Sequence, residues 1–386
     1  MGAHTRGGRG REVSPLTSSA EPRLRRLVLI GAGRANLHLL RGLTRSLVRG
    51  LEIVLVTPDA QTFDPAMTSG LLRGAYELGD ARIDVEAVAT RAGARVVHAS
   101  ASRLLPEARV VEAGGERLAF DICAIDEVGQ PTGAELPGVV EHALPLRPAS
   151  ILADVRRIVN ERLTESTGPI SCTIVGGGTT GVECAFALQR MLRNRTGGGV
   201  VSIVDGAPDI LGDAEPCREV GRHALERAGV CFALGASVVE VRADRVVLAS
   251  GGSLPTDLTI WATGGAPSPL IARSGLAHDA SGRLLVDERL RARDDAPVWA
   301  AGDCAAATGS AADLRSQPTL VEREVRRQLG AATPRRAPWG TTSLCVLDTA
   351  DGRAILRWRA VTMRSPLAWW IKRRLDHRFV SRMREA

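Results

Sequence analysis

The chain has 386 residues, of which 44% are hydrophobic and 24% charged, and its formal net charge is +7 at pH 7. This length suits two or three domains with buried cores, and the composition is typical of globular proteins. The positive charge is scattered along the chain and aromatic residues make up only 3%, which argues against a nucleic-acid-binding surface.

Residues 1–24 are rich in Gly, Arg and Ser and lack the apolar core of a signal peptide, so we expect a disordered tail. No run of about 18 apolar residues predicts a spanning helix, and a cytoplasmic location is the default expectation. The seven cysteines are widely spaced and form no CxxC pair. This spacing argues against a disulfide framework and a metal site, and we expect mostly buried thiols.

A glycine-rich turn between an apolar strand and a helix pattern occurs twice, in residues 27–43 and 170–192. Each is followed by a second strand that ends in an acid, Asp59 in the first case and Asp205 in the second. The distance from the first glycine to the acid is 28 residues in one unit and 29 in the other. The sequence therefore predicts two Rossmann-like βαβ units of matching length.

The second unit carries the full G-x-G-x-x-G fingerprint in Gly176, Gly178 and Gly181. These glycines permit the tight turn, the close approach of a pyrophosphate and the packing of helix on strand. Asp205 is expected to accept the ribose hydroxyls of an adenosine, and its charge would repel a 2′-phosphate. NADH is therefore favoured over NADPH at this unit.

The first unit keeps Gly31 and Gly33 but has Asn36 at the third position. The turn and the phosphate approach depend on the first two glycines, so we expect this corner still to bind a dinucleotide. Its ribose contact is expected from Asp59 or from Thr57. A plain packing turn without a ligand is the alternative.

Two later strands end in small residues that would let backbone approach a ligand. Gly264 lies in the Ala-Thr-Gly-Gly turn after one strand, and Asp303 lies in the Gly-Asp-Cys turn after the other. Asp303 is placed to hydrogen-bond a polyol chain. The alternative for Asp303 is the N-cap of the following segment.

In this order the motifs resemble those of flavoproteins with two dinucleotide-binding domains. The similarity is greatest to type II NADH dehydrogenases and to flavoproteins fused to or encoded beside selenophosphate synthetase, and it covers about residues 26–383. The resemblance implies an α/β fold in which an NAD domain is inserted into a FAD domain, followed by a small C-terminal α+β segment. The implied boundaries are 25–149 and 263–332 for FAD, 150–262 for NAD and 333–386 for the C-terminal segment.

The resemblance also implies site roles. Gly31, Gly33 and Asp303 would contact FAD, while the second fingerprint and Asp205 would contact NADH. Glu183 matches the glutamate of the GGGxTGVE motif and is assigned a supporting role near the flavin, and an ordinary first-turn glutamate is the alternative. Gln317, at the start of a helix that ends near Gly330, is expected beside the flavin ring.

The sequence departs from these relatives at several places. The usual first Ala-Thr-Gly is replaced near residue 126 by AIDEVGQPTG, and the stretch that usually contacts the electron acceptor is replaced by AADLRSQPT. Cys304 and Cys345 could be interpreted as a sulfur-reactive pair, although NADH-oxidising relatives share Gly-Asp-Cys. The acceptor is therefore left open between a quinone and a small molecule.

The C-terminal residues form an amphipathic, basic helix pattern. Its apolar row consists of Leu367, Ile371, Leu375, Phe379 and Met383. This row could pack on the flavin domain, which the resemblance favours, or lie peripherally on the inner face of a membrane.

These observations predict an FAD-dependent oxidoreductase that takes hydride from NADH. The alternatives are a sulfur- or selenium-linked reductase of the same fold and a flavin-binding protein without catalysis. A homodimer is compatible with the sequence, which does not specify an oligomeric state.

Overall fold

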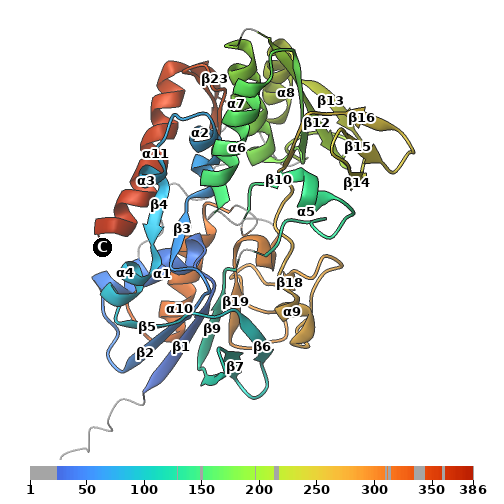
Figure 1. Ribbon diagram of the computed structural model, residues 1–386. Helices are drawn as coiled ribbons and strands as arrows, with labels where there is room; N and C mark the ends of the chain where they lie inside the picture. The colour runs from blue at the N-terminus through green and yellow to red at the C-terminus, as the bar shows by residue number, and fades with distance from the viewer. Residues whose placement is uncertain are drawn as a thin grey trace, which may run out of the picture.

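The computed structural model describes residues 24–385 except 128, 148–150, 196, 213–216, 309–310, 312–313, 334–343 and 359–360. The expected disordered tail lies outside the described residues, apart from Leu24. Two sheet-centred units stand one above the other, and the C-terminal helix runs along their side (Figure 1).

The first unit is a parallel sheet in the order β19-β9-β1-β2-β5. Helices α1 (Arg34–Arg45), α4 (Val85–Arg91) and α10 (Gln317–Gln328) pack around it. Parallel strands covered on both faces need nearly continuous apolar sequence, and β1 supplies it, since Leu27 to Ile30 are at most 1% exposed. Its strands are β1 (Arg25–Ile30), β2 (Leu51–Val56), β5 (Ala94–Val97), β9 (Ile122–Ile125) and β19 (Val298–Ala300).

The second unit repeats this arrangement in the order β10-β17-β11-β12-β13, again all parallel. Its helices are α6 (Leu152–Glu165), α7 (Thr179–Arg193) and α8 (Arg218–Arg227). Its strands are β10 (Ala143–Pro145), β11 (Ile170–Val175), β12 (Gly199–Asp205), β13 (Cys231–Leu234) and β17 (Leu258–Trp261).

Each unit also carries a three-stranded antiparallel sheet. In the first unit it precedes β9, which pairs with β1, and in the second it precedes β17, which pairs with β11. This shared order strengthens the case for an internal duplication. These sheets comprise β6 (Ala101–Leu105), β7 (Val110–Ala113) and β8 (Glu116–Ala119), and β14 (Val238–Val241), β15 (Arg245–Leu248) and β16 (Ser253–Pro255). Because β19 rejoins the first sheet, the second unit is an insertion in the first. Strand β10 belongs to the second sheet although it precedes residue 150, so that sheet begins earlier than the expected boundary.

Short elements complete the two units and the segments between them. They are β3 (Gln61–Phe63), η1 (Pro65–Met67), α2 (Thr68–Leu72), α3 (Leu78–Ala81), β4 (Arg82–Asp84), α5 (Val139–His142), α9 (Pro269–Arg273), β18 (Leu284–Leu285), η3 (Gly302–Cys304) and β20 (Ala305–Ala306). Helix α2 packs against α6 and α7 and so joins the first unit to the second.

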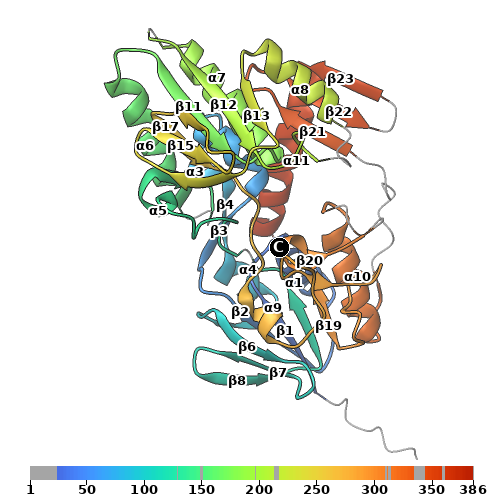
Figure 2. The same cartoon turned by 90° about the vertical axis from the view of Figure 1, so that its right-hand side faces the viewer.

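The C-terminal segment consists of an antiparallel sheet followed by a long helix. The sheet comprises β21 (Leu344–Asp348), β22 (Ala354–Trp358) and β23 (Val361–Ser365), and the helix is α11 (Pro366–Glu385). Figure 2 shows this sheet beside α8, while α11 contacts α1, α3, α4 and β4 of the first unit. Among the described residues, no helix has the length and apolarity needed to cross a bilayer.

A disulfide joins Cys217, just before α8, to Cys345 in β21, with the two Cα atoms 6.1 Å apart. The expectation of mostly buried thiols therefore holds for Cys123, Cys172, Cys184 and Cys304, but it did not foresee this bonded pair. Spacing in sequence gave no sign of it, because the two residues lie 128 positions apart and meet only when the C-terminal sheet docks on the second unit. The interpretation of Cys304 and Cys345 as a reactive pair is also wrong, since Cys345 is bonded to Cys217.

Candidate functional site

Both glycine corners open into one shared cavity of about 270 Å³. The first corner contributes Gly31 to Gly33, and the second contributes Gly178 to Thr180. The turn after β17 closes the cavity with Ala262, Thr263 and Gly264. Two ligands bound at the two corners would therefore meet inside one chamber.

The second corner has the geometry that a dinucleotide fingerprint requires. Gly176 has a φ of +113°, and a Cβ placed there would lie 2.6 Å from the carbonyl oxygen of Ala262. A Cβ at Gly181 would lie 1.9 Å from the carbonyl oxygen of Gly176, so only glycine allows α7 to approach β11 this closely. Gly178 is the N-cap of α7, and a Cβ placed there would meet no atom within 4 Å.

Asp205 ends β12 beside this corner, as its spacing predicts. Its Oδ2 accepts a hydrogen bond from the Gly177 amide at 2.5 Å, and its Oδ1 accepts one from the Ala207 amide at 2.7 Å. The carboxylate therefore fixes the glycine corner and the loop after β12. It does not itself line the cavity among the described residues.

At the first corner, a hydrogen-bonded asparagine side chain stands in place of the third glycine. Asn36 is 1% exposed, and its Nδ2 donates to the carbonyl oxygens of Gly31 at 2.8 Å, Ile30 at 3.1 Å and Ala124 at 3.3 Å. The side chain thus fills the space between α1 and the strands and satisfies their carbonyl groups. Asn36 lies behind the cavity wall, whereas Gly31 and Gly33 line the cavity.

The acid that ends the second strand of this unit also reaches the cavity. Asp59 lines it together with Thr57, Pro58, Thr62 and Phe63. Thr57 is 2% exposed, and its Oγ1 accepts a hydrogen bond from the Asp59 amide at 3.3 Å. Both candidates for a ribose contact at the first unit therefore line the cavity, and the contact itself stays a prediction.

Asp303 lies in the Gly302–Cys304 turn, and Gln317 contacts the same turn from the start of α10. The Oδ2 of Asp303 is 2.7 Å from Nη1 of Arg147, and Arg147 lines the cavity. The Oε1 of Gln317 accepts from the Gly302 amide at 2.7 Å, and its Nε2 donates to the Ala311 carbonyl at 2.9 Å. Gln317 is 2% exposed and braces this turn, without lining the cavity among the described residues.

Glu183, one turn into α7, lies in a buried polar cluster. Its Oε1 accepts from the Asp348 amide at 2.9 Å, and its Oε2 accepts from Ser69 Oγ at 3.3 Å. Lys372 of α11 places its Nζ 4.0 Å from Glu183 and 2.6 Å from Asp376. Burial raises the pKa of Glu183 to about 7, so this carboxyl group can hold a proton near neutral pH behind the cavity.

The cluster sets how α11 packs. The side of α11 that faces the protein carries Ala368, Lys372, Asp376, Val380 and Met383. The expected apolar row is therefore the packing face only in part: Met383 is buried and Ile371 and Phe379 are partly buried against the core, whereas Leu367 and Leu375 are exposed. The ion pair of Lys372 with Asp376 and the bond from Lys372 to the Ala66 carbonyl at 2.7 Å turn the helix so that charged groups are buried.

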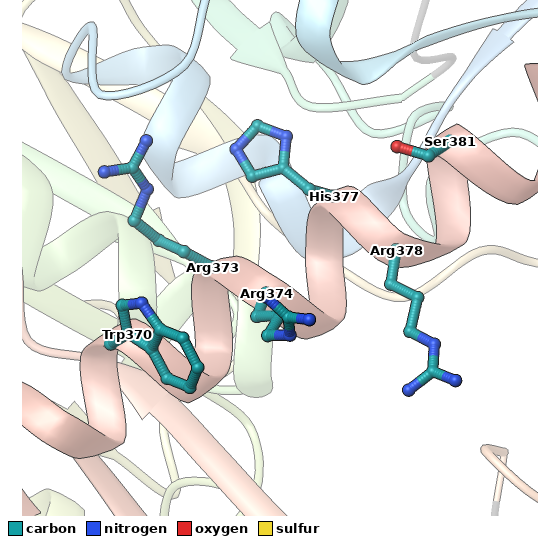
Figure 3. Close-up of a pocket in the computed structure, with 6 residues that line it drawn as sticks. All are labelled: Trp370, Arg373, Arg374, His377, Arg378 and Ser381. Atoms are coloured by element: carbon teal, nitrogen blue, oxygen red, sulfur yellow. The ribbon is translucent and has the colours of Figure 1, made fainter.

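The outer face of α11 is basic and aromatic. Figure 3 shows Trp370, Arg374 and Arg378 projecting from it, with the Arg374 guanidinium 5.4 Å from the Trp370 ring. His377 and Arg373 point the other way, toward Tyr76. The helix is thus packed on the protein, which is one of the two alternatives left by the sequence.

Cys304 is fully buried, and its Sγ donates to the Glu127 carbonyl at 2.9 Å. Burial raises the pKa of the thiol well above its usual range. A thiol held in this form is a poor nucleophile.

Sequence reasoning missed several residues around the cavity. Thr68, Glu127, Arg147, Thr179 and Thr180 line it, and Asp126 stands directly behind the first corner. The only signal was the loss of the first Ala-Thr-Gly, which marked position 126 as unusual without saying what the new carboxylate does.

Two parallel units whose glycine corners share one chamber define the class of proteins with two dinucleotide-binding domains. The chain belongs to the pyridine nucleotide-disulphide oxidoreductase family, whose sequence pattern matches residues 25–327. Family membership confirms the resemblance and the predicted α/β fold.

Relatives agree with the predicted class of NAD(P)H oxidoreductase. The chain is 26% identical over 351 residues to a mitochondrial internal alternative NAD(P)H-ubiquinone oxidoreductase of Arabidopsis thaliana, covering 81% of this chain and 67% of that protein. It is 29% identical over 213 residues to a demethylphylloquinone reductase of Synechocystis sp., covering 54% of this chain and 52% of that protein. Against the second of these relatives, the chain spans about half of the protein's length.

A solved structure shares the fold over almost the whole chain. The sulfide:quinone oxidoreductase of Aquifex aeolicus superposes with a TM-score of 0.78 over 94% of this chain and 92% of that one, at 15% identity. At this identity the likeness concerns the fold alone.

Proposed function

We propose that this protein is a flavin-dependent oxidoreductase of the type II NADH dehydrogenase kind, which oxidises NADH and passes electrons to a quinone-like or small-molecule acceptor. The observation that carries the proposal is the single cavity onto which both glycine corners open. Hydride transfer requires the two reacting rings to lie in contact and away from water, and a shared chamber meets that requirement.

The residues of the first corner suit FAD along most of its length. Gly31 and Gly33 present no side chain to the cavity, and Thr57 and Asp59 offer ribose partners. When bound, FAD would supply the ring that accepts hydride and passes electrons on. Asp126, behind this corner, opposes a pyrophosphate there, because its carboxylate already accepts from the amides that open α1.

The second corner is assigned to NADH. Among the described residues, no side chain caps the amides that open α7, so these amides are placed to receive a pyrophosphate. The hydroxyl groups of Thr179 and Thr180 line the same wall. Asp205 supports NADH over NADPH, because its charge disfavours a 2′-phosphate.

Within this function, Glu183 holds a proton close to the chamber, and Lys372 and Asp376 fix its surroundings. Gln317 and Arg147 hold the Asp303 turn in position. The basic outer face of α11 offers a surface for a peripheral membrane contact, which is the route we propose to a quinone acceptor.

A spectroscopic titration tests the proposal. The purified full-length protein is loaded with FAD and mixed with NADH without oxygen. We expect the absorbance of oxidised flavin near 450 nm to bleach within seconds and to return on addition of a quinone. A flavin-loaded protein that NADH does not bleach would contradict the proposed function.

A further inference from the structure

The two units differ at the residue that follows the central strand next to each glycine corner. Asp126 follows β9, and Ala262 follows β17. The Asp126 amide bonds to the Ile30 carbonyl and the Ala262 amide to the Val175 carbonyl, each at 2.8 Å. Their carbonyl groups press on Gly31 and Gly176 in the same manner. Position 126 of one unit therefore matches position 262 of the other.

The Asp126 side chain occupies the N-terminus of α1. Its Oδ2 accepts from the Ala35 amide at 2.6 Å and from the Asn36 amide at 3.3 Å, and its backbone oxygen accepts from the Gly33 amide at 3.0 Å. The residue is 6% exposed. Ala262 cannot do the same for α7, because it has no polar side chain.

The carboxylate is wedged between two glycines. A Cβ at Gly33 would lie 2.3 Å from Cγ of Asp126, and a Cβ at Gly302 would lie 2.8 Å from its Oδ1. The gap between the first corner and the Gly302–Cys304 turn is therefore filled by this group. A larger residue at either glycine would exclude the Asp126 carboxylate from this space.

A helix N-terminus that already holds a carboxylate is a poor site for a second anion. The amides that Asp126 uses are those that a Rossmann unit offers to a pyrophosphate, and like charges repel strongly in a buried site. We propose that Asp126 competes with the pyrophosphate of FAD for the N-terminus of α1 and so sets how tightly this site holds FAD. This inference rests on the assignment of FAD to the first unit under the proposed function.

The charged groups around Asp126 do not cancel this competition. Arg34 of α1 faces it but pairs with Asp64 at 3.3 Å, and Asp303 of η3 adds a second negative charge. Glu127, next in the chain, has a buried Oε2 with no hydrogen-bond partner among the described residues. Burial raises the pKa of both Asp126 and Glu127. Protonation of either group would weaken the repulsion, so FAD should bind more tightly as the pH falls.

The test replaces Asp126 with the residue of the other unit. Full-length wild type and D126A are stripped of flavin and titrated with FAD, with binding followed by quenching of flavin fluorescence. We expect the dissociation constant of D126A to be about tenfold lower than that of wild type. D126N keeps an acceptor for the α1 amides and removes the charge, so it should show a smaller gain in FAD affinity. If D126A does not fold, D126N is used for the test.

Two controls separate this local effect from net charge and from Glu127. D121N removes a negative charge at the opposite end of β9 and should leave the FAD affinity unchanged. E127Q removes the titration of Glu127, so the pH dependence of FAD affinity that remains in E127Q should come from Asp126. As the pH is lowered, the affinity of wild type for FAD should rise, and the rise should be smaller in D126N.

Equal or weaker FAD binding by both Asp126 variants would overturn the inference, even if NADH bleaches the wild-type flavin and the proposed function stands. Tight binding by D126A alone, with none by wild type, would support the inference and contradict the proposed function. Failure of all variants to bind FAD would contradict both.

Discussion

Lys372 of α11 and Glu183 of α7 face each other inside the protein, with Nζ 4.0 Å from Oε1. They are 7% and 4% exposed, respectively. The C-terminal helix thus inserts a cation beside the helix that begins at the second glycine corner. This contact links the last residues of the chain to the proposed active site, and two predictions follow from it.

Removal of the Lys372 charge should destabilise the fold. K372M would leave Glu183 and Asp376 buried without their shared cation, and loss of one partner of a buried ion pair costs about 3 to 5 kcal/mol. The free energy of unfolding from urea titration measures the effect. R374M on the exposed face of the same helix is the control, with an expected change below about 1 kcal/mol. Similar losses in the two variants would contradict the prediction.

The raised pKa of Glu183 should make stability depend on pH. Because its pKa rises from 4.5 to about 7 on folding, the folded protein binds more protons than the unfolded chain between these values. The contribution of Glu183 to the free energy of unfolding is therefore complete below about pH 4.5. It falls as the pH rises toward 7, by on the order of 3 kcal/mol.

E183Q isolates this contribution. Relative to wild type, E183Q should gain stability as the pH is raised from about 5 to 7.5, because glutamine has no proton to lose. Paired urea titrations at the two pH values measure the difference. A stability difference between the two proteins that does not change with pH would show that Glu183 does not titrate in this range.

The sequence sufficed for the two units because their chemistry is local. Glycines at fixed spacing and an acid at the end of the next strand locate a corner without any knowledge of distant residues. Contacts made between remote segments left no comparable pattern, as with the disulfide from Cys217 to Cys345. The apolar row of α11 predicted the buried face only in part, because the contacts of Lys372 that orient the helix are made with Glu183 and Ala66, elsewhere in the chain.

Asn36 shows a further limit of fingerprint reasoning. Judged against the motif, it is a defective third glycine, yet its side chain makes hydrogen bonds to three backbone carbonyl groups. The motif states what a helix needs in order to approach a strand closely. It does not say that the amide of an asparagine can bridge the helix and the strands in place of a glycine.

Restoring the third glycine should therefore weaken the protein. N36G would complete the fingerprint of the first unit, but it would leave the carbonyl oxygen of Gly31 without its buried donor and would remove one of the two donors to the Ile30 carbonyl. We expect a loss of about 2 kcal/mol in the free energy of unfolding, measured by urea titration. N194G, at the C-cap of α7, provides a control for the loss of an asparagine side chain at a helix end. A gain in stability in N36G would contradict the prediction, because it would show that the protein is more stable with glycine than with the hydrogen bonds of Asn36.

Coenzyme preference should depend on Asp205. In D205S the hydroxyl group can still accept from the Gly177 amide, so the corner keeps part of its support while its negative charge is lost. We expect the dissociation constant for NADH to rise about tenfold and that for NADPH to fall, because a neutral residue no longer repels the 2′-phosphate. Calorimetric titration with each coenzyme measures the ratio, and D209S, on the loop beyond the corner, controls for loss of a nearby charge. An unchanged ratio of NADH to NADPH affinity in D205S would mean that the carboxylate only braces the glycine turn, and that specificity is set by another residue.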